Sequence, residues 1–87
     1  MTNQRIPSIS ELEPVLMEIL TDAEFPLTNL EILKSAKIRL DLSEEVSDTI
    51  HDGNRTELEY RLAWARSRAK KKNLVRRVGN QKWELNK

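Results

Sequence analysis

Cysteine is absent from this sequence, and histidine and glycine are scarce, with one and two copies among 87 residues. Without cysteine there is no disulfide framework and no thiolate metal site. Gly53 and Gly79 are the only glycines, so no glycine-rich phosphate loop can form. His51 stands beside Asp52 in a predicted loop, and this pair does not supply the converging ligands of a metal site. We therefore expect no metal, no cofactor and no catalytic residue, so the chain is not predicted to be an enzyme.

Long apolar runs are also missing. The first residues, Met1 to Ile6, do not contain the apolar segment of a signal peptide, and no stretch approaches the length that spans a membrane. The lack of cysteine fits a reducing compartment. These absences favour a cytoplasmic protein, and a membrane is not among its expected partners.

The charges that are present are distributed unevenly. The formal net charge is +1, but residues 1–52 carry four basic and eleven acidic side chains, a balance of −7. Residues 53–87 carry eleven basic and three acidic side chains, a balance of +8. A split of this size favours a face that binds a polyanion, with the acidic remainder turned away from it. Chance, or a need for solubility, is the alternative explanation.

Apolar spacing predicts a first helix near the start of the chain. Its stripe consists of Leu12, Val15, Leu16, Ile19 and Leu20. Ser10 and Glu13 have the spacing of a capping box, and Pro14 favours a helix start in this turn. The segment Phe25–Leu27 then forces an extended connection that a short strand could occupy.

A second helix follows directly. Thr28 and Glu31 form another capping-box pattern, and the helix should run to about Leu40. Leu33, Ala36 and Leu40 are predicted to form its inner face, with Leu30 and Ile32 on the flanks. Residues 41–53 read as a loop with a short helical turn that begins near Ser43, anchored to the core by Val46 and Ile50.

The longest helix is predicted from about Arg55 to Lys72. Asp52, Gly53 and Asn54 break the chain and offer its N-cap, and Asn73 suits a left-handed C-terminal cap. Its inner stripe consists of Leu58, Leu62, Ala65 and Ala69. Residues 74–78 and 81–85 then predict a hairpin around Gly79–Asn80, with Trp83 and Leu85 facing the core.

This order of elements is that of a winged helix-turn-helix. We expect a mostly α, α+β fold with three main helices and a two-stranded wing, forming one domain over residues 1–87 with a flexible N-terminus at about 1–8. Such a fold presents its third helix and its wing to duplex DNA.

The residues predicted to bind DNA lie on the third helix and the wing. Small polar groups on the outward helix face can reach base edges, and basic groups on its edges and in the wing can contact phosphates. The predicted set is Arg55, Thr56, Tyr60, Arg61, Ser67, Arg68, Lys71, Arg76, Arg77, Asn80, Gln81 and Lys82. A solvated helix surface with lysines that complement the helix dipole is the alternative. Trp64 is interpreted as a brace for the wing or first helix rather than as a base-stacking residue.

These residues also carry a family resemblance. Tyr60–Arg66 is similar to the N-R-V-x-W-A-R stretch on the long helix of the N-terminal winged-helix domain of Mrr-type restriction endonucleases. The run Lys70–Val75 resembles that family's K-K-x-G-L-L segment, and Val78–Leu85 resembles its G-x-W-x-L wing return. Leu42–Glu45 is similar to its L-T/S-E-E connection. Asn73 replaces a usual glycine, and Tyr60 replaces a frequent asparagine, which weakens any inherited base contact there.

The resemblance implies a target-recognition module for enzymes that act on modified DNA. Double-stranded DNA is then the expected partner, and a nuclease domain covalently attached after Lys87, or a second copy of the chain, are further candidates. Two other functions stay open from the residues alone. One is a protein-interaction or dimerisation winged helix that uses the Trp64 region and the wing, and the other is a small stand-alone transcriptional regulator.

Overall fold

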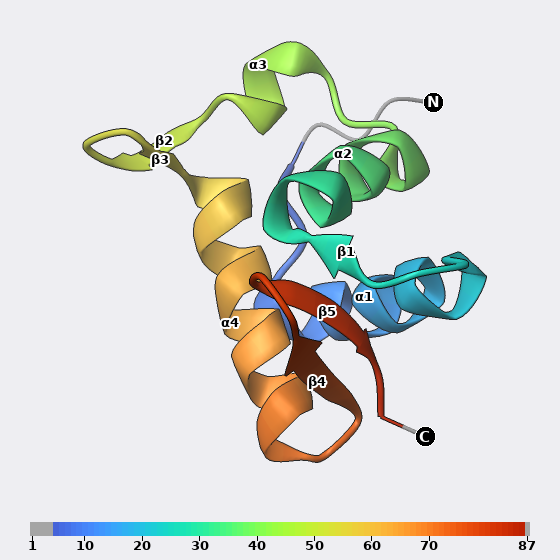
Figure 1. The fold of residues 1–87 in the computed structure, drawn as a ribbon. Helices are drawn as coiled ribbons and strands as arrows, with labels where there is room; N and C mark the ends of the chain where they lie inside the picture. The colour runs from blue at the N-terminus through green and yellow to red at the C-terminus, as the bar shows by residue number, and fades with distance from the viewer. Residues whose placement is uncertain (1–4, 87) are drawn as a thin grey trace.

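A computed structural model describes residues 5–86 and shows three main helices that pack around one core, with a small sheet at one end (Figure 1). In chain order the elements are α1 (Ile9–Asp22), β1 (Leu27–Thr28), α2 (Asn29–Leu40), α3 (Glu44–Ser47), β2 (Ile50–Asp52), β3 (Arg55–Thr56), α4 (Glu57–Lys71), β4 (Val75–Val78) and β5 (Lys82–Leu85). The helix α4 packs chiefly across α1, and α2 covers part of its remaining inner side. This arrangement confirms the predicted α+β class and is that of a winged helix.

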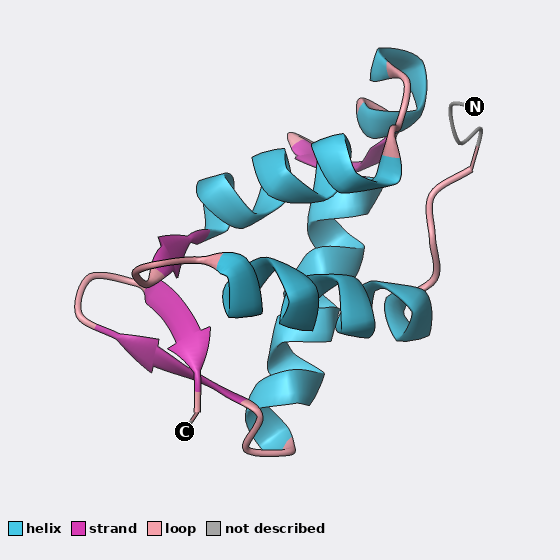
Figure 2. Cartoon of the chain, turned by 90° about the vertical axis from the view of Figure 1, so that its right-hand side faces the viewer, coloured by secondary structure: helices cyan, strands magenta, loops and turns pink. Residues whose placement is uncertain are grey.

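The sheet has one strand more than the predicted wing. The strands lie in the order β1-β5-β4 and are all antiparallel, with Leu27 opposite Trp83 and Val75 opposite Leu85. Figure 2 shows this sheet beside the ends of α1 and α2. A separate small hairpin, β2–β3, stands at the N-terminal end of α4 (Figure 1).

The core confirms the predicted stripes of the first and longest helices. Ala65 and Ala69 are fully or almost fully buried on α4, and their small side chains allow α1 to approach closely. Trp83 is only 8 % exposed and Leu85 is half-buried against the same core, as predicted. The buried apolar residues are Leu12, Leu16, Ile19, Leu20, Ile32, Ala36, Leu58, Leu62, Ala65, Ala69, Val75 and Trp83.

The first helix begins earlier than predicted. Ser8, not Ser10, is its N-cap, and the Ser8 hydroxyl accepts a hydrogen bond from the Glu11 amide at 3.1 Å while the Glu11 carboxylate accepts one from the Ser8 amide at 2.9 Å. Both serines stand three residues before a glutamate, so the local pattern allowed either start. Pro14 consequently lies inside the helix, where its missing amide removes one backbone hydrogen bond.

The inner face of α2 is also rotated from the predicted one. Its cap is correct, since Thr28 and Glu31 form the reciprocal capping box. However, Ile32 and Ala36 are the buried residues, Leu33 is only half-buried, and Leu30 is 58 % exposed. The helix therefore turns Leu30 to solvent beside α4.

Two predictions for residues 41–56 are wrong. The short helix after Ser43 is present, but Ile50 is 60 % exposed and cannot anchor the loop to the core. Gly53, with a φ of +45°, makes the turn of the β2–β3 hairpin instead of capping the long helix. Thr56 is the N-cap of α4, and its hydroxyl accepts a hydrogen bond from the Glu59 amide at 3.1 Å.

The C-terminal end of α4 follows the predicted turn chemistry, and the wing turn follows it in part. Asn73 adopts the left-handed conformation with a φ of +63°, as predicted. Gly79 has the predicted positive φ, but the wing turn has three residues, because Val78 pairs with Lys82 and Gln81 is also left-handed. In the predicted flexible segment at 1–8, residues 1–4 lie outside the described part. In the rest, Pro7 is buried against the fold.

Candidate nucleic-acid interface

The helix α4 turns one face to the core and the opposite face to solvent. Its inner stripe is buried in the angle between α1 and α2, so the outward side lies away from the other main helices (Figure 1). The exposed residues of the helix and its cap are Trp64, Ser67, Arg68, Lys70, Lys71 and Lys72. Of the predicted set, this face carries Ser67, Arg68 and Lys71.

Some predicted contact residues are engaged within the protein instead. Arg61 donates from Nε to the Glu57 carboxylate at 2.8 Å and from Nη1 to the carbonyl oxygens of Ile6 and Pro7 at 3.0 and 3.1 Å. These contacts fasten the segment before α1 to the middle of α4. Arg61 therefore acts as a structural cation, although its position on the helix is the one expected for a DNA contact.

The N-terminal half of α4 presents aromatic rather than basic groups. Tyr60 stacks on His51 with ring centres 3.8 Å apart and planes at 14°, and Trp64 meets Tyr60 edge to face at 6.5 Å. His51 Nδ1 lies 2.8 Å from Glu57 Oε1, so the β2–β3 hairpin is fixed to the helix. Trp64 was predicted to be a partly buried brace of the wing or first helix; it is 48 % exposed, and its ring contacts Tyr60 of the same helix.

Glu57 accepts a hydrogen bond from Arg61 and contacts His51 of the β2–β3 hairpin. The hydrogen bond from Arg61, followed by the one from His51, lowers the pKa of the Glu57 carboxyl. The carboxylate therefore stays ionised at neutral pH and holds three segments of the chain together. Its role is structural, and among the described residues no group of three or more histidine, cysteine or acidic side chains could hold a metal ion.

The wing divides its basic residues in a similar way. Arg76 donates from Nε to the Glu84 carboxylate across the hairpin at 2.7 Å, which neutralises it. Arg77 faces the other side of the sheet, where its guanidinium lies 5.7 Å from the centre of the Trp83 ring. Asn80, Gln81 and Lys82 are exposed in and beside the turn. The tip of the wing thus keeps the predicted polar groups, whereas Arg76 is paired.

Arg66 is a basic residue of α4 that was not included in the set predicted to bind DNA. It is half-buried between α4 and the wing, with its guanidinium 5.8 Å from the centre of the Trp83 ring. Burial lowers the pKa of Arg66, and the positive charges of Arg55 and Arg77 lower it further. Helical spacing places Arg66 on the same flank as Lys70, but its contact with Trp83 of the wing depends on the tertiary fold.

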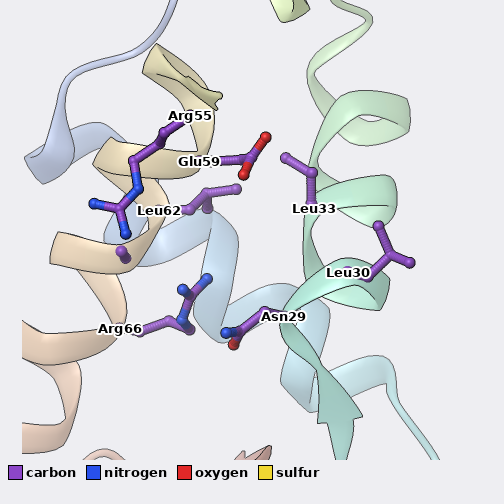
Figure 3. A pocket seen from close by; sticks show the side chains of 8 residues that line it. Asn29, Leu30, Leu33, Arg55, Glu59, Leu62 and Arg66 are labelled. Atoms are coloured by element: carbon purple, nitrogen blue, oxygen red, sulfur yellow. The ribbon is translucent and has the colours of Figure 1, made fainter. Parts of the chain in front are cut away.

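A pocket of about 340 Å³ opens beside Arg66, between α2 and α4. Figure 3 shows Arg55 and Arg66 on the α4 side and Leu30 and Leu33 on the α2 side. Asn29, at the start of α2, lies next to Arg66. The pocket is lined by Asn29, Leu30, Leu33, Arg55, Glu59, Leu62, Ala63 and Arg66.

Ion pairs separate the basic residues of the molecule into two groups. Arg5, Arg39, Arg61, Lys72 and Arg76 are paired with carboxylates. Within residues 5–86, seven basic residues of β3, α4 and the wing form no ion pair; they are Arg55, Arg66, Arg68, Lys70, Lys71, Arg77 and Lys82. The uneven charge of the sequence is thus partly cancelled inside the fold. Within residues 5–86, most of the basic side chains without an ion pair lie on these elements, and the other two, Lys34 and Lys37, lie on α2.

Comparison with known proteins agrees with this arrangement. The family model described as the Mrr N-terminal domain matches residues 10–87, which is most of the chain. No curated protein and no solved structure matches the chain significantly. In the described part, no helix is long and apolar enough to cross a membrane.

Proposed function

The chain belongs to the Mrr N-terminal domain family, and on this basis we propose that it binds duplex DNA as the target-recognition module of a restriction-type nuclease. The observation that carries the proposal is the group of seven basic side chains without a carboxylate partner on β3, α4 and the wing, counted among the described residues. Cations that the fold leaves uncompensated on one set of elements suit a polyanion. Cytoplasmic DNA is the natural partner for such a surface.

In this proposal, α4 enters the major groove with its solvent face. Ser67 and Lys71 point outward toward base edges, and Arg68 and Lys70 reach the phosphates on either side. The helix carries its unpaired basic residues in its C-terminal half, whereas Tyr60, Trp64 and the paired Arg61 lie in the N-terminal half. We therefore expect the C-terminal half of α4 to lie closer to the phosphates of the duplex than the N-terminal half.

The wing supplies a second contact through its tip. Arg77 and Lys82 are the cations that remain for phosphate contact, with Asn80 and Gln81 in the turn between the strands. Three members of the predicted set receive internal roles instead, since Thr56 caps α4 and Arg61 and Arg76 are paired. The proposed set gains Arg66 and Lys70.

Fluorescence anisotropy with a labelled duplex over a series of salt concentrations tests the proposal. Seven free cations set an upper limit of about −6 on the slope of log K against log salt, from a slope near −0.9 for each neutralised phosphate. The change K82E should reduce the steepness by about 1 to 2, because it removes one attraction and adds one repulsion. R39E makes the same change in net charge on a paired arginine of α2 and should leave the slope unchanged. No binding at low salt would refute the proposal.

Catalysis is assigned by this proposal to a separate nuclease domain. The isolated chain should therefore bind but not cleave duplex DNA in the presence of magnesium. Cleavage by the purified chain, lost on substitution of one of its carboxylates, would contradict this division of roles.

One observation favours a second candidate function. Trp64 is 48 % exposed and Ile50 is 60 % exposed, and large exposed apolar groups are typical of protein interfaces. A protein-interaction domain would use this region to contact another domain or a second copy. Sedimentation velocity of the wild type and W64A distinguishes the two candidates. A dimer that dissociates in W64A, without DNA binding at low salt, would replace DNA binding as the function.

A further inference from the structure

The pocket between α2 and α4 brings positive charges together without a counterion. Arg55 and Arg66 line it, and Arg77 is close enough to lower the pKa of Arg66. None of these three forms an ion pair within the described residues. Glu59 is the one carboxylate of the lining, and its Oε1 accepts a hydrogen bond from the Thr56 hydroxyl at 3.1 Å. The two arginines of the lining therefore share the pocket with one carboxylate, which accepts a hydrogen bond from Thr56 and forms an ion pair with neither of them.

Such an arrangement is unfavourable for the isolated domain. A half-buried guanidinium loses part of its hydration, and neighbouring like charges add repulsion that no internal partner offsets. Arginines elsewhere in this fold avoid that state, because Arg61 and Arg76 each bind a glutamate. The fold keeps Arg66 half-buried and without an ion pair, which is expected where an anion from outside completes the site.

Asn29 adds a hydrogen-bond donor that faces the same space. Its Oδ1 accepts a hydrogen bond from the Trp83 indole at 2.8 Å, so its amide nitrogen must point the other way. Figure 3 shows that nitrogen turned toward Arg66. Because the Asn29 amide nitrogen and the Arg66 guanidinium are both hydrogen-bond donors, they cannot bond to each other and need an acceptor between them. Asn29 and Leu30, which begin α2, also place the positive end of the helix dipole at this side of the pocket, whereas the Glu31 amide is capped by Thr28.

Trp83 holds two of the arginines in place. The guanidinium groups of Arg66 and Arg77 lie 5.8 and 5.7 Å from the centre of its ring, within the range of cation–π contacts. The ring itself is fixed by burial and by its bond to Asn29. The cations are thus ordered before any ligand arrives, which reduces the entropy that binding would lose.

We propose that Arg55, Arg66 and the Asn29 amide form a binding site for one backbone phosphate of duplex DNA, an inference that rests on the proposed function. Guanidinium groups bind phosphate oxygens in paired hydrogen bonds, and the pocket of about 340 Å³ leaves room for the group and its water. The exposed side chain of Leu30 on the opposite wall suits the apolar face of a deoxyribose. This site lies between α2 and α4, so a single phosphate would fix the position of both helices on the duplex.

Neutral variants test the site against a matched control. R55Q is the cleanest change, because no ion pair or hydrogen bond involving the Arg55 side chain is found within the described residues. R66Q removes the central group. Each should weaken duplex binding about tenfold, the effect of a lost charge-assisted hydrogen bond, and lower the salt slope by about 1. R39Q makes the same charge change at an arginine that is paired with Asp22 and does not line the pocket, and it should bind like the wild type. Thermal unfolding of R66Q checks that its contact with Trp83 is not needed for folding.

A second measurement separates this inference from DNA binding as such. Inorganic phosphate, added at constant ionic strength against chloride, should shift the NMR signals of the Arg66 Nε–H group and the Trp83 indole in the wild type and not in R66Q. If the wild type binds duplex, and R55Q and R66Q keep its affinity and slope, the phosphate site is refuted while the proposed function stands. If the wild type does not bind duplex but phosphate shifts these signals, the proposed function fails and the pocket is a site for a free phosphate.

Discussion

Arg61 and Arg68 lie on the same flank of α4, seven residues apart, yet their surroundings predict opposite effects of the same substitution. Arg61 is bonded to Glu57 and to two carbonyl oxygens, whereas Arg68 is exposed on the helix surface. Replacement of each by glutamine removes one positive charge. We expect R61Q to lower stability with little direct effect on DNA affinity, and R68Q to lower DNA affinity with little effect on stability.

The size of the first effect follows from the contacts of Arg61. It makes three hydrogen bonds, at 2.8, 3.0 and 3.1 Å, and its side chain is 32 % exposed. A hydrogen bond to a charged group contributes roughly 1.5 to 3 kcal/mol, and solvent screening together with partial replacement by glutamine keeps the total near the lower end. The free energy of unfolding should fall by about 2 kcal/mol. For a domain of this size, that corresponds to a decrease in Tm of roughly 8 to 16 °C.

Calorimetry and anisotropy on the same samples measure both quantities. For R68Q the free energy of unfolding should change by less than about 0.5 kcal/mol, and the salt slope of duplex binding should decrease by about 0.9. For R61Q the slope should equal that of the wild type at temperatures below its own transition. The reasoning is refuted if R61Q keeps its Tm and loses as much of the salt slope as R68Q.

Three further predictions follow from single side chains. Hydrogen bonds lower the pKa of Glu57 from its ordinary value of 4.5, so its contribution to stability is present above that pH and is lost as the pH falls through the lowered pKa. In urea titrations, the stability difference between wild type and E57Q should therefore shrink below about pH 4.5. A constant difference down to pH 2 would contradict this assignment. W83A should lower the free energy of unfolding by about 3 to 5 kcal/mol, because the Trp83 ring is buried. W64A should change it by less than about 1 kcal/mol, because Trp64 is 48 % exposed. Equal losses in the two variants would show that Trp64 braces the fold. Q81G should raise Tm by a few degrees, because Gln81 has a φ of +56°, at which glycine is less strained by about 1 kcal/mol. A lower Tm would show that the glutamine side chain stabilises the wing turn.

Local chemistry predicted the parts of the fold that depend on few neighbouring residues. The capping box of Thr28 and Glu31 and the left-handed cap at Asn73 are set by side chains within three residues of the helix ends. The stripe of α4 is equally local, because a period of 3.6 residues leaves one apolar face. These features needed no knowledge of the rest of the chain.

The errors arise where distant residues decide between local alternatives. Ser8 and Ser10 both fit a capping box, and the burial of Pro7 and the hydrogen bonds from Arg61 favour the earlier start. The same bonds convert Arg61 from a predicted DNA contact into an internal cation. Basic side chains of α4 and its cap are paired with carboxylates that lie 4 to 59 residues away in the sequence. Helical spacing does not predict which basic side chains find such a partner.

The pairing of β1 with β5 has a consequence for how the domain can be divided. Leu27 and Thr28 lie opposite Trp83 and Lys82, so the basic second half completes its sheet only with a strand from the acidic first half. Pairing over such a separation forms late in folding and joins both halves in one cooperative unit. A fragment that starts at residue 53 would keep all twelve residues predicted to bind DNA, but it would lack β1, which pairs with β5 of the wing. The fragment would keep the basic charge of the second half of the chain, but it would lose the arrangement of the wing strands that β1 stabilises.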